Sequence, residues 1–259
     1  MPSFTDYVDL HCERLQDGLF EEPLNMVSNL LFFIGAYFLF KSYKKADIRA
    51  PRVKFLIYLI VAFGIGSLIF HSTARMWGAL FDVLPIAMFA MLYLYEFARH
   101  VLRLNRLNTV VMIGIFALAN VVFKTYVIKA PDGYVSLIPS IMVMYCISLY
   151  MFAKRNRSAM RFSTATLLAT FAATCRAIDS YMNEGSLCQN FPHGTHFLWH
   201  SLMAGYVYIV TEDIILRCKA QRQEMKIARL AKLKRIARKR MARKKRKAAK
   251  SITSMFSDY

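Results

Sequence analysis

The sequence predicts an all-α fold: a seven-transmembrane helix bundle with its N-terminus outside, its C-terminus in the cytoplasm and a basic helical tail. Two features of the 259 residues lead to this prediction, because 56% are hydrophobic and yet the formal net charge is +19. An ordinary soluble domain does not combine the two, so the apolar and basic residues must occupy different stretches. The 20 Phe, 14 Tyr and 15 Met exclude a chain disordered throughout, and five Cys are too few for a small disulfide-built fold.

The basic charge is concentrated near the C-terminus. Residues 217–250 hold 17 Lys or Arg and one acid, Glu224, so they carry +16 of the net charge of +19. Residues 1–23 are acidic and lack the apolar stretch of a cleaved signal peptide. We therefore divide the chain into an acidic extracytoplasmic segment (1–23), a membrane domain (24–216) and a basic cytoplasmic tail (217–259).

The membrane domain contains seven apolar stretches, each close to the roughly 20 residues that a helix needs to cross a bilayer. Several are apolar around the whole helix, which is typical of membrane spans and disfavours a large soluble helical domain. The stretches are 24–43, 55–74, 79–97, 109–128, 135–153, 161–179 and 196–216.

The linkers between these stretches set the expected orientation. Lys and Arg crowd the linkers after the first, third and fifth stretches, and the basic tail follows the seventh. The alternate linkers are poor in positive charge; the fourth holds only Lys124 and Lys129. Because cytoplasmic loops carry the excess of Lys and Arg, the N-terminus is expected outside and the C-terminus inside.

Five polar residues inside the stretches are expected at one depth, near the outer leaflet. Ser67 and His71 lie four residues apart near the outer end of the second stretch, and Asp82 begins the third. His196 and His200 open the seventh stretch with the same four-residue spacing. Residues so spaced share one face of a helix, and ionisable groups inside spans are functional candidates by default.

Three imidazoles and a carboxylate are the groups that a catalytic zinc site needs. His71, His196 and His200 would hold the ion and leave one position for water. Asp82 would move the proton of that water, and Ser67 would donate a hydrogen bond to the developing oxyanion. A lone histidine in a span is more often a satisfied polar contact, so the prediction depends on all five converging. His11 and His193 are expected to be neighbours of the site and not ligands.

Ser67-x3-His71-x10-Asp82, followed by His196-x3-His200, resembles the alkaline ceramidase family of the CREST membrane hydrolases. The N-terminal His-Cys-Glu-Arg and Glu-Pro-Leu-Asn runs are similar to its bacterial members in particular. The resemblance implies a seven-helix amidase that hydrolyses ceramide to a sphingoid base and a fatty acid. It also implies Zn²⁺ on the three histidines, with Asp82 and Ser67 in the roles given above.

The resemblance further implies a calcium site, but only in part. Eukaryotic members hold Ca²⁺ near an N-terminal Cys-Glu pair, and Glu13 and Glu22 match two of those positions. Leu10 and Leu15, however, stand where the family has Asp and Asn. The alternative is that the two glutamates cap or brace helix ends, with Arg176 as a candidate partner.

Two structural pairings are also expected. The family has a disulfide between cysteines placed like Cys12 and Cys188, so the resemblance implies that bond here. Arg176 and Asp179 lie three residues apart on one helix face and are expected to form a structural ion pair; contact with a lipid head group is the alternative.

The sequence pattern of the tail predicts a basic helix with a thin apolar stripe. Ile227, Leu230, Leu233, Ala237 and Met241 recur at steps of three or four residues among Lys, Arg and Ala. Anionic lipid of the cytoplasmic leaflet is the expected partner, and no specific nucleic acid is expected. A polyanion such as RNA and a solvated tail are the alternatives.

Two other classes of protein stay open from the sequence alone. A seven-helix receptor of the progestin and adipoQ receptor type shares the Ser, His, Asp and His-x3-His theme, and a non-catalytic membrane protein could keep a metal for stability. The N-terminal motifs and the expected outside N-terminus favour the ceramide-like N-acyl lipid hydrolase. A bacterial inner membrane is the expected location, or the endoplasmic reticulum or Golgi if the source is eukaryotic.

Overall fold

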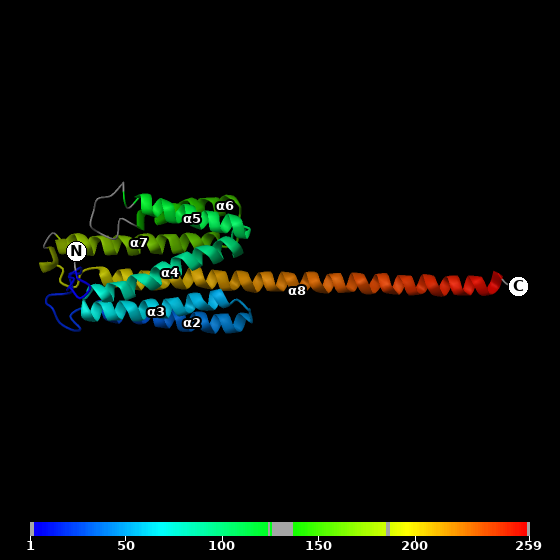
Figure 1. The fold of residues 1–259 in the computed structure, drawn as a ribbon, viewed down its shortest axis with the longest axis horizontal. Coiled ribbons are helices and arrows are strands. Elements are labelled where there is room, and N and C mark those ends of the chain that lie inside the picture. The colour runs from blue at the N-terminus through cyan, green and yellow to red at the C-terminus, as the bar shows by residue number, and fades with distance from the viewer. Residues whose placement is uncertain (1–2, 124, 126–136, 185–186, 258–259) are drawn as a thin grey trace. The chain divides into compact units, whose positions relative to one another are not determined.

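The computed structural model describes residues 3–123, 125, 137–184 and 187–257, and its regular structure is helical (Figure 1). The chain divides into two compact units, residues 1–217 and 218–259. The elements in order are α1 (Pro23–Ser28), α2 (Leu30–Ala46), α3 (Pro51–Thr73), α4 (Met76–His100), α5 (Arg106–Val122), α6 (Ile138–Ala153), α7 (Ala159–Glu184), the 3-10 helix η3 (Leu187–Gln189) and α8 (His196–Ser257).

Local sequence signals explain where several helices begin and end. Pro23 and Pro51 occupy the first positions of α1 and α3, where a missing N–H costs nothing. Asn105 caps α5, because its side chain accepts a hydrogen bond from the backbone of Asn108. α3 ends at Ala74, which has a left-handed backbone with φ 44° and turns the chain into α4.

The all-α class is confirmed for the described residues, and each predicted apolar stretch overlaps a helix. Three helical segments, Pro23–Ala46, Pro51–Thr73 and Met76–His100, are long and apolar enough to cross a membrane. The apolar helices α5 and α6 are shorter. The end of stretch 109–128, the start of stretch 135–153 and the linker with Lys124 and Lys129 lie outside the described residues. Seven spans and their orientation stay a prediction.

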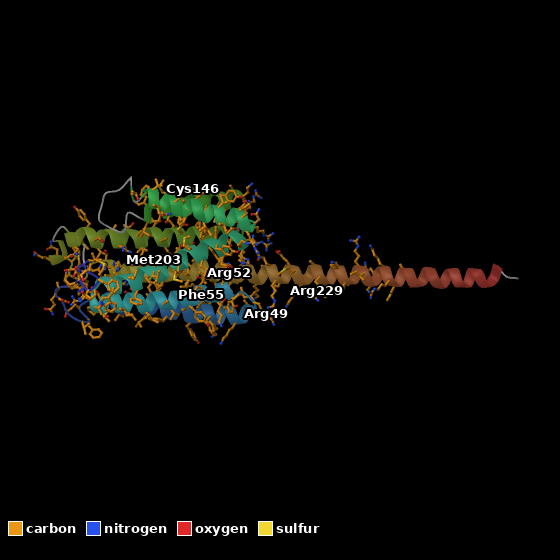
Figure 2. The ribbon with its side chains drawn as sticks, viewed as in Figure 1. Arg49, Arg52, Phe55, Cys146, Met203 and Arg229 are labelled. Atoms are coloured by element: carbon orange, nitrogen blue, oxygen red, sulfur yellow. A yellow bond between two sulfur atoms is a disulfide. The ribbon has the colours of Figure 1, made fainter. Side chains whose placement is uncertain are left out.

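Apolar side chains cover the outer surfaces of several helices in residues 1–217. Leu84 on α4, Ile115 on α5 and Leu149 on α6 are between 52% and 70% exposed, and Phe55 on α3 is 45% exposed (Figure 2). Water disfavours so much exposed apolar surface, whereas lipid tails accept it. The exposed apolar surface therefore fits a protein surrounded by lipid.

α3 and α4 pack against each other closely enough to bring Ser67 near Asp82. A Cβ on Gly66 would lie 2.0 Å from the carbonyl oxygen of Phe81, so only glycine permits this approach. The N-terminal segment then lies across the turn between the two helices, where Val8 donates a hydrogen bond to the carbonyl of Ala74 at 2.9 Å. The segment that follows Val8 is thereby placed over the C-terminal end of α3.

The other end of α3 carries a second polar cluster. Arg52 pairs with Glu96 of α4 at 2.5 Å, and His100 contacts the same carboxylate at 3.1 Å. Asp213 of α8 accepts hydrogen bonds from Ser158 and Arg161. Figure 2 shows Arg49 and Arg52 at this end, which we name the basic end.

Candidate metal centre

Two helices bring the three predicted histidines together. His71 comes from the last turns of α3, and His196 and His200 come from the first turns of α8. All three side chains are buried, and their ring centroids lie 4.7 to 5.1 Å apart. The three histidines therefore lie near one another, and their role as ligands stays a prediction.

His11 is a fourth member of this cluster, which sequence reasoning had placed only in its neighbourhood. Its ring lies 3.8 Å from that of His196 and 5.1 Å from that of His71, between centroids. One nitrogen each of His11, His71 and His196 fall within 4.8 Å of one another, so these buried groups could bind a metal ion. The available signal was the position of His11 beside Cys12.

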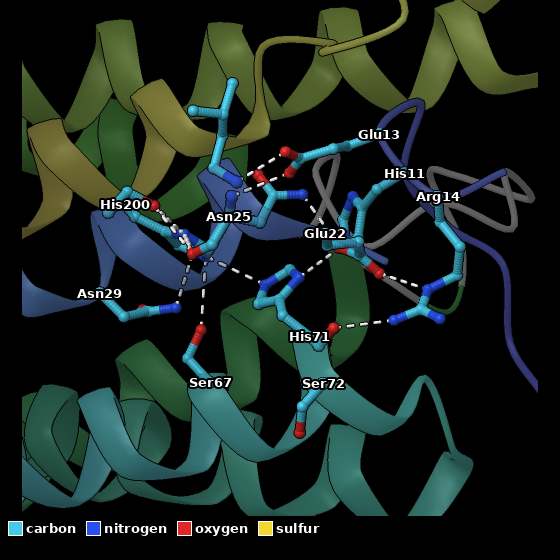
Figure 3. A network of polar contacts seen from close by, with 12 residues as sticks. His11, Glu13, Arg14, Glu22, Asn25, Asn29, Ser67, His71, Ser72 and His200 are labelled. Atoms are coloured by element: carbon cyan, nitrogen blue, oxygen red, sulfur yellow. Dashed lines mark hydrogen bonds and ion pairs between the residues drawn. The ribbon is translucent and has the colours of Figure 1, made fainter. Parts of the chain in front are cut away.

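The Nδ1 atoms of His71 and His200 each face a hydrogen-bond acceptor. Nδ1 of His71 lies 2.5 Å from a carboxylate oxygen of Glu22, and Nδ1 of His200 lies 3.1 Å from the carbonyl oxygen of Asn25 (Figure 3). Each Nδ1 therefore carries the proton, which leaves a lone pair on each Nε2. The two Nε2 atoms nevertheless face each other at 3.2 Å.

This arrangement fits a metal ion. Two lone pairs repel each other at such a distance unless a cation or proton lies between them. Two nitrogen ligands about 2.0 to 2.1 Å from a tetrahedral zinc ion are about 3.3 Å apart, close to the separation between His71 and His200. Nδ1 of His196 is also buried and has no hydrogen-bond partner among the described residues. The donor set of neutral imidazoles with acceptors behind them is typical of bound zinc.

Ser67 and Asp82 lie beside these histidines. The hydroxyl of Ser67 is 3.4 Å from Nε2 of His200 and interacts with the Asp82 carboxyl. Oδ1 of Asp82 is buried and has no hydrogen-bond partner among the described residues. Arg176 is near enough to exert an attractive charge interaction on this carboxylate. The site thus holds a carboxylate oxygen that is free to accept a proton.

Glu22 links the cluster to a buried cation. Nε of Arg14 donates to Glu22 at 2.6 Å, and another nitrogen of Arg14 donates to the carbonyl of His71 at 2.7 Å. Burial raises the pKa of Glu22, but the hydrogen bond and charge of His71 and the hydrogen bond of Arg14 outweigh it and hold that pKa at about 2. Glu22 is therefore ionised and orients the ring of His71.

The same contacts bear on the calcium prediction. Glu13 accepts hydrogen bonds from the backbone N–H groups of Leu24 and Asn25, at 2.6 and 2.9 Å, and so braces the start of α1. The two oxygens of Glu22 are taken by Arg14, His71 and Asn25. Because all four carboxylate oxygens already accept from protein donors, this geometry supports the bracing role.

Comparison with known proteins decides the family. The sequence profile that defines the Ceramidase family matches residues 18–237. The chain belongs to the ceramidase family. A search of curated proteins finds no match. Membership in this family, together with three long apolar helices, indicates a membrane protein that acts on a lipid amide.

The matched region of this ceramidase-family chain contains the three predicted ligands, Ser67 and Asp82. It begins after His11, Cys12 and Arg14 and reaches 20 residues past the end of unit 1. The N-terminal contacts to the site are therefore additional to what the family comparison supports.

A disulfide joins Cys12 to Cys188, the pair that the resemblance implies, with their Cα atoms 5.0 Å apart. The predicted ion pair between Arg176 and Asp179 is wrong. Asp179 instead contacts Nδ1 of His11 at 3.0 Å and accepts from the backbone of Thr195 at 2.8 Å. Arg176 lies over the ring of Trp199. The two side chains are three residues apart on α7, but the N-terminal segment provides Asp179 with a closer partner.

An apolar cavity of about 180 Å³ is lined by residues of the helices from α3 to α8. Its lining includes Phe63, Phe89, Met144, Trp199 and Met203. Trp199 directly precedes His200, so the cavity approaches the histidine cluster along α8. A cavity with this lining suits a hydrocarbon chain.

Proposed function

We propose that the protein is a zinc-dependent intramembrane amide hydrolase that cleaves ceramide or a related N-acyl lipid to a long-chain base and a fatty acid. The observation that supports this most is the pair of Nε2 atoms of His71 and His200, which face each other with an acceptor behind each ring. A free carboxylate oxygen of Asp82 next to this pair adds the acid–base group that amide hydrolysis requires.

The residues divide the chemistry among them. His71, His196 and His200 would hold Zn²⁺, which when bound polarises a carbonyl oxygen and lowers the pKa of water. Asp82 accepts a proton from the attacking water as the water oxygen forms a bond to the amide carbon. Asp82 then returns that proton to the nitrogen of the leaving amine as the C–N bond breaks.

Ser67 acts on the oxygen of the amide. Its hydroxyl lies between His200 and Asp82 and donates a hydrogen bond to the oxygen that becomes negative in the tetrahedral intermediate. A single donor of this kind is worth about 2.7 to 4 kcal/mol of transition-state stabilisation in acyl transfer. The acyl chain occupies the apolar cavity, and the buried walls exclude bulk water.

The proposal includes seven spans, with the metal site near the outer leaflet and the basic end in the cytoplasm. The site and the basic end lie at opposite ends of α3, because Arg52 is near its first residue and His71 near its last. Arg49 and Arg52 lie at the basic end, as the positive-inside rule requires. A lipid substrate then enters sideways from the outer leaflet, and a bacterial inner membrane is the favoured location.

The second unit is proposed to bind anionic lipid of the cytoplasmic leaflet. Its helix exposes Ile227, Leu230 and Leu233 by 53% to 67%, among many Lys and Arg residues. An amphipathic basic helix lies on an anionic surface, and each positive charge contributes roughly 1 kcal/mol there.

Lipid mass spectrometry of purified protein tests the catalytic proposal. The protein is incubated with a panel of N-acyl lipids as wild type, as Asp82→Asn and as the control Asp47→Asn. Asp47 is exposed and has a left-handed backbone that Asn tolerates. We expect release of fatty acid by wild type and control, its loss on chelation, and a drop on the order of a thousandfold in Asp82→Asn.

Two results would contradict the proposal. Equal product from wild type and Asp82→Asn would refute the assigned role of the carboxylate. A wild-type protein that binds zinc but releases no fatty acid from any lipid of the panel would favour the receptor-like or non-catalytic alternatives.

A further inference from the structure

We propose that His11 is a fourth ligand of the metal ion, supplied by the N-terminal segment that precedes the residues matched by the family profile. The inference rests on the metal site of the proposed function and adds to its ligand set. The predicted triad came from the membrane helices alone, whereas the structure brings a further imidazole, His11, to His71 and His196. His200 joins the group through its contact with His71.

The first support is position. The ring of His11 stacks against that of His196 with a centroid separation of 3.8 Å and an interplanar angle of 33°. A nitrogen of His11 belongs to the group that falls within 4.8 Å together with nitrogens of His71 and His196. The side chain is almost fully buried, with the residue only 6% exposed.

The second support is the group behind the ring. Nδ1 of His11 lies 3.0 Å from the Asp179 carboxylate, which is itself 1% exposed. Glu22 stands behind His71 in the same way. A carboxylate that accepts the proton of one ring nitrogen fixes the tautomer, and the other nitrogen is then free to bind a metal. Two of the four imidazoles in the cluster thus have this arrangement.

The third support is that covalent and close packing contacts fix the position of the N-terminal segment around His11. Cys12, the next residue, is bonded to Cys188 in the stretch before α8. Gly194 has φ +56°, and a Cβ there would lie 1.9 Å from Oδ1 of Asp179 and 3.0 Å from Cβ of Cys12. Only glycine allows these three parts of the chain to meet. The disulfide and the close contact keep His11 against the cluster.

A fourth imidazole is compatible with hydrolysis. Zinc at catalytic sites sometimes expands to five ligands, and in that geometry four nitrogens leave one position for water. A neutral imidazole adds no charge, and its main effect is tighter binding of the ion. Because the disulfide positions His11, reduction of Cys12–Cys188 should weaken metal binding as well.

Two measurements on the full chain in detergent test this. X-ray absorption of the zinc-loaded wild type counts the imidazoles around the ion; we expect four, and a count of three would overturn the inference. Chelator competition then compares the zinc affinity of wild type, His11→Ala and the control His193→Ala. His193 is exposed in the same outer region. We expect His11→Ala to bind zinc at least about tenfold more weakly, and the control to equal wild type.

The Cys12–Cys188 bond, detected by mass spectrometry without reduction, reports whether His11→Ala has folded. Unchanged affinity in a folded His11→Ala would overturn the inference, and if that variant does not fold, the imidazole count of wild type still decides. Three imidazoles with normal lipid hydrolysis would remove His11 and leave the proposed function intact. A wild type that binds no zinc would overturn both.

Discussion

The two polar clusters at the ends of α3 bury similar charged groups but differ in the partners of those groups. At the basic end, Glu96 is buried but pairs with Arg52, whose side chain is 59% exposed. At the metal centre, Arg14 is fully buried against Glu22, and nitrogens of His71 and His200 face each other. The Glu96 carboxylate thus pairs with a group that reaches water, whereas Oδ1 of Asp82 and Nδ1 of His196 are buried at the metal centre without a hydrogen-bond partner among the described residues.

This difference between the clusters indicates that the metal centre is the reactive one. A buried polar atom without a hydrogen bond costs roughly 1 to 3 kcal/mol, and a ligand that occupies the site is one explanation for such an atom. His196 and Asp82 each carry one at the metal centre. The ion pairs of the basic end explain how helices are joined there, although Oε2 of Glu212, next to Asp213, also has no hydrogen-bond partner among the described residues.

The largest effect separates the clusters by activity. His200→Ala removes a proposed ligand, so we expect hydrolysis to fall on the order of a thousandfold or more. The matched change at the basic end is His100→Ala, which removes a contact to Glu96 and should change activity less than about threefold. Fatty-acid release per mole of folded protein measures both. Equal losses would mean that the metal centre has no special role.

The next effect compares stability without metal. Glu22→Gln leaves the guanidinium of Arg14 buried without its counter-charge, so we expect a loss of about 3 to 5 kcal/mol in the free energy of unfolding. Glu96→Gln should cost about 1 kcal/mol or less, because Arg52 reaches water. Unfolding by SDS in mixed micelles, with chelator present, measures the two. Equal costs would show that the exposure of the arginine does not control these pairs.

The same contrast explains what the sequence could predict. Depth in the membrane follows from the order of apolar stretches, and helix periodicity gives the i, i+4 pairs. Together they place Ser67, His71, Asp82, His196 and His200 in one region. The helical class follows from the same pattern. These inferences use local spacing and topology, which the chain cannot violate without exposing polar groups to lipid.

The rest depends on contacts between distant segments. His11 reaches the cluster through a disulfide and a contact with Asp179, 168 residues away in sequence. The local rule for residues three apart predicted a pair between Arg176 and Asp179, and that distant partner displaced it. Arg14 was likewise not recognised as the buried cation beside Glu22. No periodicity reports which loop lies over which helix end.

A smaller effect tests the meeting point of these segments. Gly194→Ala places a methyl group against Asp179 at a strained backbone angle, so we expect slower formation of the Cys12–Cys188 bond and a lower thermal midpoint. Gly114→Ala on α5 is the control, since no other part of the described residues lies within 4 Å of the added Cβ, apart from the backbone of the same helix. It should leave stability unchanged or raise it by up to about 1 kcal/mol. Non-reducing mass spectrometry and thermal unfolding measure both variants, and identical behaviour would contradict the close contact.

The smallest effect on hydrolysis is expected from the Lys and Arg residues of the C-terminal tail. These charges are exposed, and few acidic residues lie near them in the sequence. Neutralising part of the tail should leave the rate of fatty-acid release unchanged but free the helix from anionic lipid, because each charge contributes roughly 1 kcal/mol at such a surface. The variant replaces six residues by Gln: Lys232, Lys234, Arg235, Arg238, Lys239 and Arg240.

Cleavage with Glu-C at Glu224 and with chymotrypsin in the tail, followed over time in nanodiscs, measures this; neither protease depends on the residues replaced. We expect the wild-type tail to be protected with anionic lipid and cleaved quickly with neutral lipid, and the variant to be cleaved quickly with both. Equal cleavage of the wild type in the two lipids would show that its charges are simply solvated. The tail would then differ from both clusters of α3, because water would solvate its charges without a protein partner or a ligand.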